Sequence, residues 1–172
     1  MQLIRDRRGS AAVEFAFVAP LMLLIYYGIA ELTQGMMADR RMSHVASAIG
    51  DLIAQDTNVT SAEMTDVFNV GNAIMAPFNT ATLAMRITSV KADAGGTPKI
   101  IWSQGKGSLA GLTVGGTATI PANMLAANES LIMSEVKYVY SSPIKKVLPT
   151  DITFNQKFYL KPRKTSEVTY TP

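Results

Sequence analysis

The N-terminal part of the chain carries one apolar segment that is long enough to cross a membrane. The segment Ala11–Ala30 contains twenty residues and is interrupted only by Glu14 and Pro20. A helix of about 20 apolar residues, rising 1.5 Å per residue, spans the hydrocarbon core of a bilayer. Tyr26 and Tyr27 lie near its far end, where amphipathic rings favour the membrane interface. The pattern predicts a transmembrane helix over residues 10–32.

Helical periodicity continues beyond the apolar segment and predicts an amphipathic continuation over residues 33–56. Spacings of three and four residues, broken once near the charged run 39–41, predict a stripe that faces the rest of the chain. Pro20 is expected to kink the helix, because proline removes one backbone hydrogen bond. The apolar positions of the stripe are Ile29, Leu32, Met36, Met42, Val45, Ile49, Leu52 and Ile53.

The period changes from helix to strand in the remainder, residues 57–172, which we expect to form an exported head domain. Thr60 or Ser61 can cap a second helix that ends before Pro77. Alternating residues and turn residues then predict a hairpin and two longer strands. These strands are Leu83–Val90, Lys99–Ser103, Leu131–Ser141 and Ile152–Lys161. The predicted fold class is α+β, with the long N-terminal helix packed on a small antiparallel sheet of about four strands.

Composition and charge agree with a membrane anchor. Charged residues make up 17% of the chain, against about 25% in an average soluble domain. Arg5, Arg7 and Arg8 precede the apolar segment, so the positive-inside rule predicts a cytoplasmic N-terminus and a periplasmic C-terminal domain. Cysteine is absent, which excludes disulfides, thiolate metal sites and a cysteine nucleophile.

Glu14 distinguishes among three interpretations of the apolar segment: a removed signal peptide, a plain signal anchor, and a pilin-type leader cut on its cytoplasmic side. A carboxylate inside hydrocarbon costs about 2.5 to 3.5 kcal/mol, so Glu14 requires a cationic partner there. Cleavage after Gly9 would create such a partner, because Ser10 would carry an α-ammonium group one helical turn away. A plain anchor with a snorkelling Glu14, or signal-peptidase cleavage after Ala30, remain the alternatives.

The residues around Glu14 also carry a family resemblance. The run Gly9-Ser10-Ala11-Ala12-Val13-Glu14-Phe15 resembles the prepilin cleavage motif of tight-adherence (Tad) pilus systems, with its glutamate fifth and its aromatic residue sixth in the mature chain. With Pro20, Gly28 and Glu31, the first 35 residues or so resemble the TadE-like minor pilins, also called pseudopilins. Asp6 departs from a uniformly basic leader.

The resemblance implies a function, partners and a location. It implies cleavage between Gly9 and Ser10 by a prepilin peptidase, removal of the leader 1–9, and subunit registration through Glu14 and Phe15. The protein would help to initiate or tip assembly of a Tad-type pilus used in surface adhesion. Its partners would be other pilins, minor pilins and the inner-membrane assembly platform. It would span the inner membrane once and could become extracellular in the assembled pilus.

The rival interpretation is a single-pass, membrane-anchored periplasmic binding protein or adhesin that does not polymerise. The C-terminal part is basic, and its lysines provide either a solvated strand face or a docking surface for an acidic partner subunit or for anionic surfaces. The candidate docking lysines are Lys137, Lys145, Lys146, Lys157 and Lys161.

The sequence favours a structural role over an enzymatic one. His44 is the only histidine, so a two-histidine metal site cannot form within one chain. The glycines from Gly105 to Gly111 lack the spacing and the βαβ context of a dinucleotide loop. We expect no enzymatic activity, cofactor, metal, small-molecule substrate or nucleic-acid partner.

Overall fold

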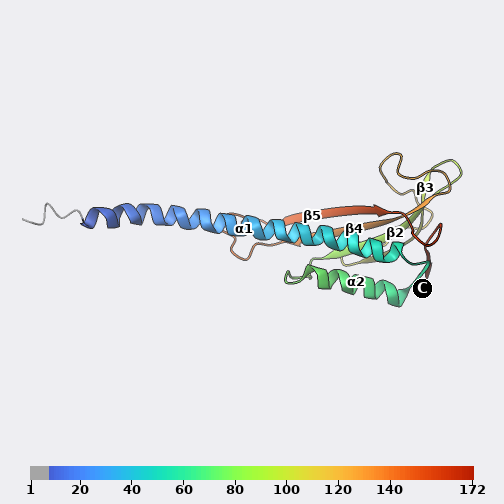
Figure 1. Cartoon of the computed structure of the whole chain (residues 1–172), viewed down its shortest axis with the longest axis horizontal. Coiled ribbons are helices and arrows are strands. Elements are labelled where there is room, and N and C mark those ends of the chain that lie inside the picture. The colour runs from blue at the N-terminus through green and yellow to red at the C-terminus, as the bar shows by residue number, and fades with distance from the viewer. Residues whose placement is uncertain (1–7) are drawn as a thin grey trace, which may run out of the picture. The chain divides into compact units, whose positions relative to one another are not determined.

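The computed structural model describes residues 8–172, and residues 1–7 of the predicted leader, with Arg5 and Arg7, lie outside the described residues. The chain divides into two compact units. The first holds the chain up to Met37 together with the loop Ser141–Ile152, and the second holds Ala38–Tyr140 and Thr153–Pro172. Helix α1 (Arg8–Ala54) contributes residues to both units and contains Pro20. Figure 1 shows this long helix, which begins at the blue end of the colour bar.

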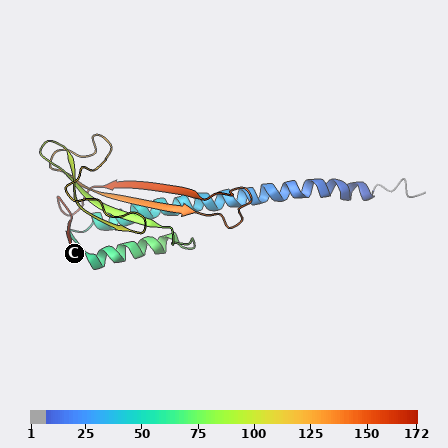
Figure 2. The ribbon, with the colours of Figure 1, turned by 180° about the vertical axis from the view of Figure 1, so that it is seen from behind.

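The second unit confirms the predicted α+β class. Its four-stranded antiparallel sheet has the order β3-β2-β4-β5. Helix α2 and the outer part of α1 share one hydrophobic cluster with this sheet, and Figure 2 shows the same elements from behind. The elements after α1 are β1 (Asn58–Thr60), α2 (Ser61–Met75), β2 (Ala84–Ala92), β3 (Pro98–Lys106), β4 (Ser130–Tyr140), β5 (Ile152–Leu160) and β6 (Thr169–Thr171).

Helix α2 begins where its capping residues predict. The Thr60 hydroxyl accepts a hydrogen bond from the Glu63 backbone N–H at 3.3 Å, and the Glu63 carboxylate accepts one from the Thr60 N–H at 2.8 Å. This reciprocal capping box satisfies two backbone donors that the first turn of a helix leaves without an intrahelical partner. The prediction of a cap at Thr60 is confirmed.

The β2–β3 hairpin is longer than the predicted one, because β2 continues towards the turn to Ala92 and β3 runs from Pro98 to Lys106, beyond the predicted end at Ser103. Asp93 Oδ1 accepts hydrogen bonds from the backbone N–H groups of Gly95 and Thr97, both at 2.9 Å. Gly96 has a φ of +81°, which glycine adopts without steric cost. These hydrogen bonds and the conformation of Gly96 close a short turn, and β3 begins at Pro98.

A bulge in β3 places Ile100 and Trp102, which are two residues apart, on opposite faces of the sheet. Ser89 pairs with Trp102, whereas the next residue, Val90, pairs with Ile100, which leaves Ile101 as an extra residue. Trp102 consequently belongs to the cluster on the helix-covered face, and Ile100 belongs to a smaller cluster on the other face.

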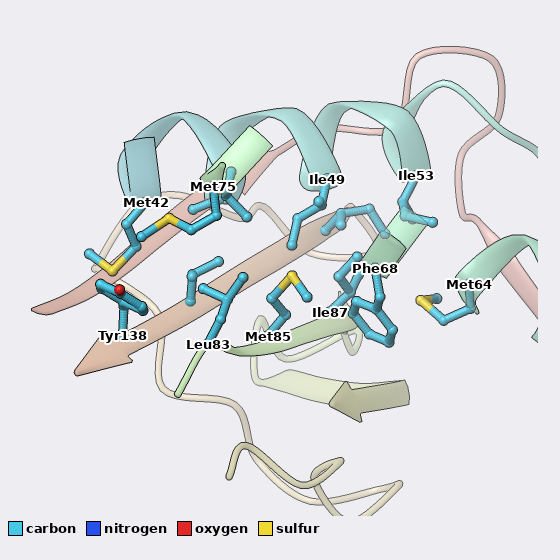
Figure 3. Packing of buried hydrophobic residues seen from close by; sticks show 14 of the residues in the cluster. Met42, Ile49, Ile53, Met64, Phe68, Met75, Leu83, Met85, Ile87 and Tyr138 are labelled. Carbon is cyan, nitrogen blue, oxygen red and sulfur yellow. The ribbon is translucent and has the colours of Figure 1, made fainter. Parts of the chain in front are cut away.

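The main core lies between the helices and one face of the sheet. Met42, Ile49 and Ile53 of α1 are buried against residues of α2 and of the strands (Figure 3). Methionines from three elements, Met42, Met75 and Met85, are fully buried, as expected for flexible side chains that fill irregular space. The outer half of the predicted apolar stripe is thus confirmed, except that Leu52 is exposed.

For the inner half of that stripe, the prediction that its apolar residues face the rest of the chain is wrong. Ile29, Leu32 and Met36 are exposed, although their spacing matches the buried positions that follow. The buried positions before Met42 are small residues and one acid: Gly28, Glu31, Gly35 and Ala38. Small residues permit close approach of another segment, so the buried side of this helical stretch is not its most apolar side.

A small parallel sheet near the C-terminus escaped prediction. Strand β1 pairs with β6, with Val59 opposite Tyr170. The Trp102 indole N–H donates a hydrogen bond to the Val168 carbonyl at 2.7 Å, and its ring lies 5.6 Å from that of Tyr170. These contacts attach the last residues of the chain to the core of the second unit.

Candidate functional site

The candidate site is the first part of α1, whose large apolar side chains are exposed. Phe17 is 79% exposed and Phe15 is 68% exposed. An uncovered apolar surface of this extent marks a membrane or protein interaction surface. The helix meets the length and hydropathy expected of a membrane span. The exposed apolar residues of this part are Val13, Phe15, Phe17, Val18, Leu21, Met22, Leu23, Leu24, Ile25, Tyr26, Tyr27, Ile29, Leu32, Met36 and Met37.

The predicted processing and registration residues all lie on α1. Gly9 and Ser10 are in its first turn, and an added Cβ at Gly9 would meet no atom within 4 Å. Glu14, Phe15 and Pro20 follow on exposed positions within the apolar segment.

Glu31 forms a site that sequence reasoning did not recognise. Its side chain is fully buried and accepts hydrogen bonds from three consecutive backbone N–H groups of the loop Ser141–Ile152. The donors are Lys146 at 2.7 Å, Val147 at 2.9 Å and Leu148 at 2.5 Å. We call this arrangement the Glu31 clasp. In the sequence, Glu31 follows the apolar segment Ala11–Ala30 and belongs to the TadE-like resemblance, but no pattern links it to the loop.

The loop is shaped to present these donors to Glu31. The Ser142 hydroxyl accepts hydrogen bonds from the backbone N–H groups of Ile144 and Lys145, at 3.3 and 3.4 Å. Lys145 has a φ of +53°, a left-handed conformation that is uncommon outside glycine. Consecutive N–H groups in such a turn form a concave anion site, here occupied by a carboxylate of the same chain.

Replacing Glu31 by glutamine is expected to release the loop. The NH2 group of the glutamine amide cannot accept a hydrogen bond, so at least one of the bonds from the loop N–H groups would be lost. Losing one such bond to a charged group costs about 1.5–3 kcal/mol. In the detergent-solubilised full chain, trypsin should cut after Lys145 and Lys146 at least about tenfold faster than in the parent, since 1.4 kcal/mol corresponds to a factor of ten.

Mass spectrometry of the fragments measures this cleavage, and Asp66→Asn, at an exposed position of α2, is the matched control. Equal cleavage of the Glu31→Gln variant and the parent would show that Glu31 does not hold the loop.

The five candidate docking lysines are distributed over several elements. Lys157 Nζ lies 2.6 Å from Glu135 Oε1, and Lys161 Nζ lies 2.9 Å from Glu129 Oε2. The hydrogen bond from Lys161 holds the pKa of Glu129 below its ordinary value. Lys137 is half-buried on β4, whereas Lys145 and Lys146 are exposed in the loop. At least two of the lysines therefore neutralise carboxylates of their own unit.

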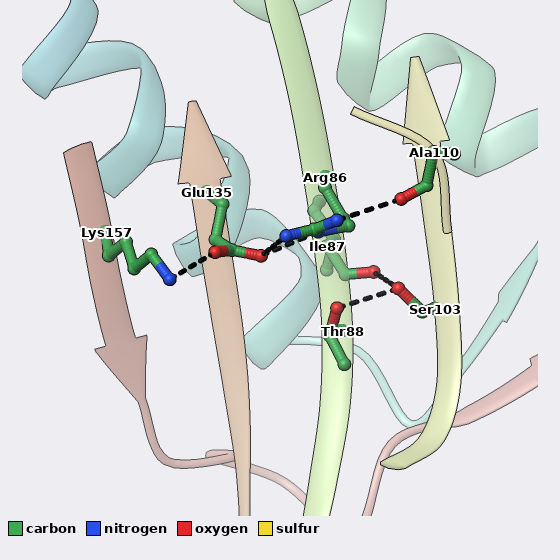
Figure 4. A network of polar contacts seen from close by, with 7 residues as sticks. All are labelled: Arg86, Ile87, Thr88, Ser103, Ala110, Glu135 and Lys157. Atoms are coloured by element: carbon green, nitrogen blue, oxygen red, sulfur yellow. Dashed lines mark hydrogen bonds and ion pairs between the residues drawn. The ribbon is translucent and has the colours of Figure 1, made fainter. Parts of the chain in front are cut away.

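An ionic network centred on the buried Glu135 crosses the sheet on the face opposite the helices. Glu135 is only 5% exposed and binds Arg86 of β2 and Lys157 of β5, both at 2.6 Å (Figure 4). Val136, the next residue on β4, points into the helix-covered core, so Glu135 points the other way. Arg86 also donates to the Ala110 carbonyl at 3.0 Å. A hollow of about 350 Å³ lies beside this network, and its lining includes the three charged residues together with residues 112–113 and 116–119.

Catalytic and metal chemistry finds little support in the described residues. Within residues 8–172, no group of three or more histidine, cysteine, aspartate or glutamate side chains is placed to hold a metal ion. His44 is exposed on α1, as expected for a solvated histidine. Gly105 belongs to β3 rather than to a phosphate-binding loop, and an added Cβ there would lie 2.0 Å from the Leu109 carbonyl oxygen.

The comparison with known families agrees with this site. Residues 9–50 match the family model of TadE-like proteins. The chain carries a TadE-like N-terminal segment. No curated protein and no solved structure matches the chain.

The TadE-like segment covers the positions that carry the site. It begins at Gly9, includes Glu14, Phe15, Pro20 and Glu31, and ends at Gly50 within the core-forming part of α1. The resemblance seen in the sequence is confirmed over these residues. The match supports a pilin-like protein associated with a Tad pilus, and the apolar helix fits a membrane-anchored protein.

Proposed function

We propose that the protein is a minor pilin, or pseudopilin, that helps to initiate or tip assembly of a Tad-type pilus. In this proposal a prepilin peptidase cuts between Gly9 and Ser10 and removes the leader 1–9, and residues 10–32 remain in the inner membrane. Residues 33–56 continue the helix, and residues 57–172 form the periplasmic head. The role is structural and requires no cofactor.

One observation carries the proposal: the TadE-like segment coincides with an apolar helix whose large side chains are exposed and which contains a carboxylate. A plain membrane anchor needs no ionisable residue at this depth, because the charge costs free energy in hydrocarbon. A subunit that packs into a helical bundle can pair the carboxylate with a cation of its own or of a neighbouring subunit. Other pilins and the inner-membrane assembly platform are the partners this packing requires.

The decisive experiment is the mature N-terminus of the protein isolated from membranes of its native host. We expect a chain that begins at Ser10, measured by intact mass and N-terminal sequencing. Replacing Gly9 by a bulkier residue such as leucine should leave the leader attached, whereas the neighbouring change Ala12→Leu should not.

A chain that keeps its leader in the presence of the peptidase would contradict the proposal and favour an anchored binding protein or adhesin. A chain that begins after Ala30 would indicate a secreted protein without an anchor, and would contradict both interpretations.

A further inference from the structure

The loop Ser141–Ile152 is attached to α1 at the level where the apolar segment ends. Glu31 holds the backbone of residues 146–148, and an added Cβ at Gly28 would lie 3.4 Å from Val147 Cγ2. Val147 therefore lies over a residue of the Ala11–Ala30 segment itself. These contacts lie within the first compact unit. Wherever this end of the helix meets the bilayer surface, the loop meets it too.

The side of α1 away from the loop is apolar at the same level. Ile29, near the end of the predicted span 10–32, is 61% exposed, and Met36, beyond that end, is 70% exposed. Exposed side chains of this kind are stable in the lipid interface and costly in water. The apolar environment of the helix therefore extends to the level of the loop.

The loop meets the conditions for an irregular backbone in the membrane interface. Where water is scarce, backbone N–H groups require an internal acceptor, and the buried Glu31 carboxylate accepts three of them. Pro143 and Pro149 have no N–H group to satisfy. Val147 is 38% exposed, so the part of the loop nearest Gly28 presents an apolar side chain outwards.

Charged groups of the loop are placed to meet lipid headgroups. Lys145 and Lys146 are exposed next to Val147, and lysines at such a level extend their ammonium groups to the headgroup phosphates. Asp151 lies 3.7 Å from Lys145 Nζ and offsets one of the two charges. Lys146 is therefore the main group available for contact with a phosphate.

We propose that the loop Ser141–Ile152 is a membrane-interface element of the anchored subunit, with Val147 at the edge of the hydrocarbon and Lys146 at the lipid headgroup phosphates. This rests on the membrane anchoring in the proposed function, but not on cleavage or on pilus assembly. The partner is the leaflet from which α1 emerges. Glu31 makes the contact possible by satisfying the loop backbone.

Depth measurements on the full chain reconstituted in vesicles test the proposal, because the absence of cysteine permits single-cysteine labels. We would place an environment-sensitive fluorophore at Val147→Cys and compare it with two references. The first reference is Leu24→Cys, because Leu24 lies within the proposed span and is 59% exposed. The second is Val114→Cys, because Val114 lies in the second unit and is 65% exposed. Quenching by headgroup-attached nitroxide and by soluble acrylamide reports the depth of each label.

We expect the Val147→Cys label to be quenched by the headgroup nitroxide and to be several-fold less accessible to acrylamide than the Val114→Cys label. Adding Glu31→Gln should raise its acrylamide accessibility towards that of the Val114→Cys label. Adding Lys146→Gln should lower the equilibrium constant for contact between the loop and the surface of anionic vesicles about fivefold. The decrease should be smaller in zwitterionic vesicles. Unchanged fluorescence of Trp102 would show that the labelled variants retain their core.

Equal accessibility of the Val147→Cys and Val114→Cys labels would overturn the proposal. Protection at Val147 that requires added pilin subunits would assign the loop to a protein interface and would also overturn it. A Leu24→Cys label that mid-bilayer nitroxide does not quench would instead contradict membrane anchoring itself. The test therefore separates failure of this inference from failure of the proposed function.

Discussion

Pilus assembly is expected to be lost when Glu14 is replaced by alanine, while membrane insertion and N-terminal processing continue. After cleavage, the α-ammonium of Ser10 would lie one turn from Glu14 or face it from a neighbouring subunit. A charge in hydrocarbon costs about 2.5–3.5 kcal/mol, so each subunit contact that loses this pairing should weaken about 100-fold.

Electron microscopy of surface pili in the native host measures this effect, and immunoblots of membrane fractions measure insertion and processing. The matched control is Val13→Ala, one residue away and 56% exposed, which removes apolar area but no charge. Pili in normal number and length from the Glu14→Ala strain would refute the role of Glu14 in registration. Loss of processing in that strain would assign the residue to peptidase recognition instead.

The second large effect is expected on stability, from Glu135→Ala. Removing this carboxylate leaves Arg86, whose side chain is 16% exposed, without its ionic partner. Breaking a buried ion pair from one side costs about 3–5 kcal/mol, because the remaining charge stays desolvated. Glu129→Ala removes a similar pair with Lys161, but both its side chains are exposed, so we expect a loss of at most about 1 kcal/mol.

Urea unfolding of the full chain in detergent, followed by the fluorescence of Trp102, gives both free energies of unfolding. Trp102 is the only tryptophan, and it lies in the main hydrophobic cluster, so its signal reports on the core of the second unit. Similar losses for the Glu135→Ala and Glu129→Ala variants would show that burial does not distinguish the two pairs. The carbonyl of Ala110 would then be the sufficient partner of Arg86.

The elements predicted with success are those whose signals are local. The α2 cap depends on Thr60 and Glu63, three residues apart, and the hairpin depends on Asp93 and Gly96 within one turn. The strands β4 and β5 were located to within one residue, because their alternation is long and bounded by prolines or turn residues. Such signals arise from backbone geometry and short-range hydrogen bonds, which neighbouring residues determine.

The functional residues divide in the same way. Gly9, Glu14 and Phe15 form a motif readable along a few residues, and the family match covers them. The roles of Glu31 and Glu135 were not recognised, because their partners are distant in the sequence. The partners of Glu31 lie 115 to 117 residues away, and Arg86 lies 49 residues from Glu135. The position of a carboxylate in the sequence does not predict such distant partners, which only the folded structure brings together.

The amino-acid sequence by itself determined the long apolar helix at the N-terminal end, the α+β class and the position of the TadE-like motif. Each depends on hydropathy or on local pattern. Only the tertiary structure decided the strand order, the pairing of β1 with β6 and the buried side of α1 around Glu31. That side was misjudged because apolarity favours Ile29, Leu32 and Met36, whereas close packing favours glycine, and a carboxylate is buried at low cost where three N–H groups meet it.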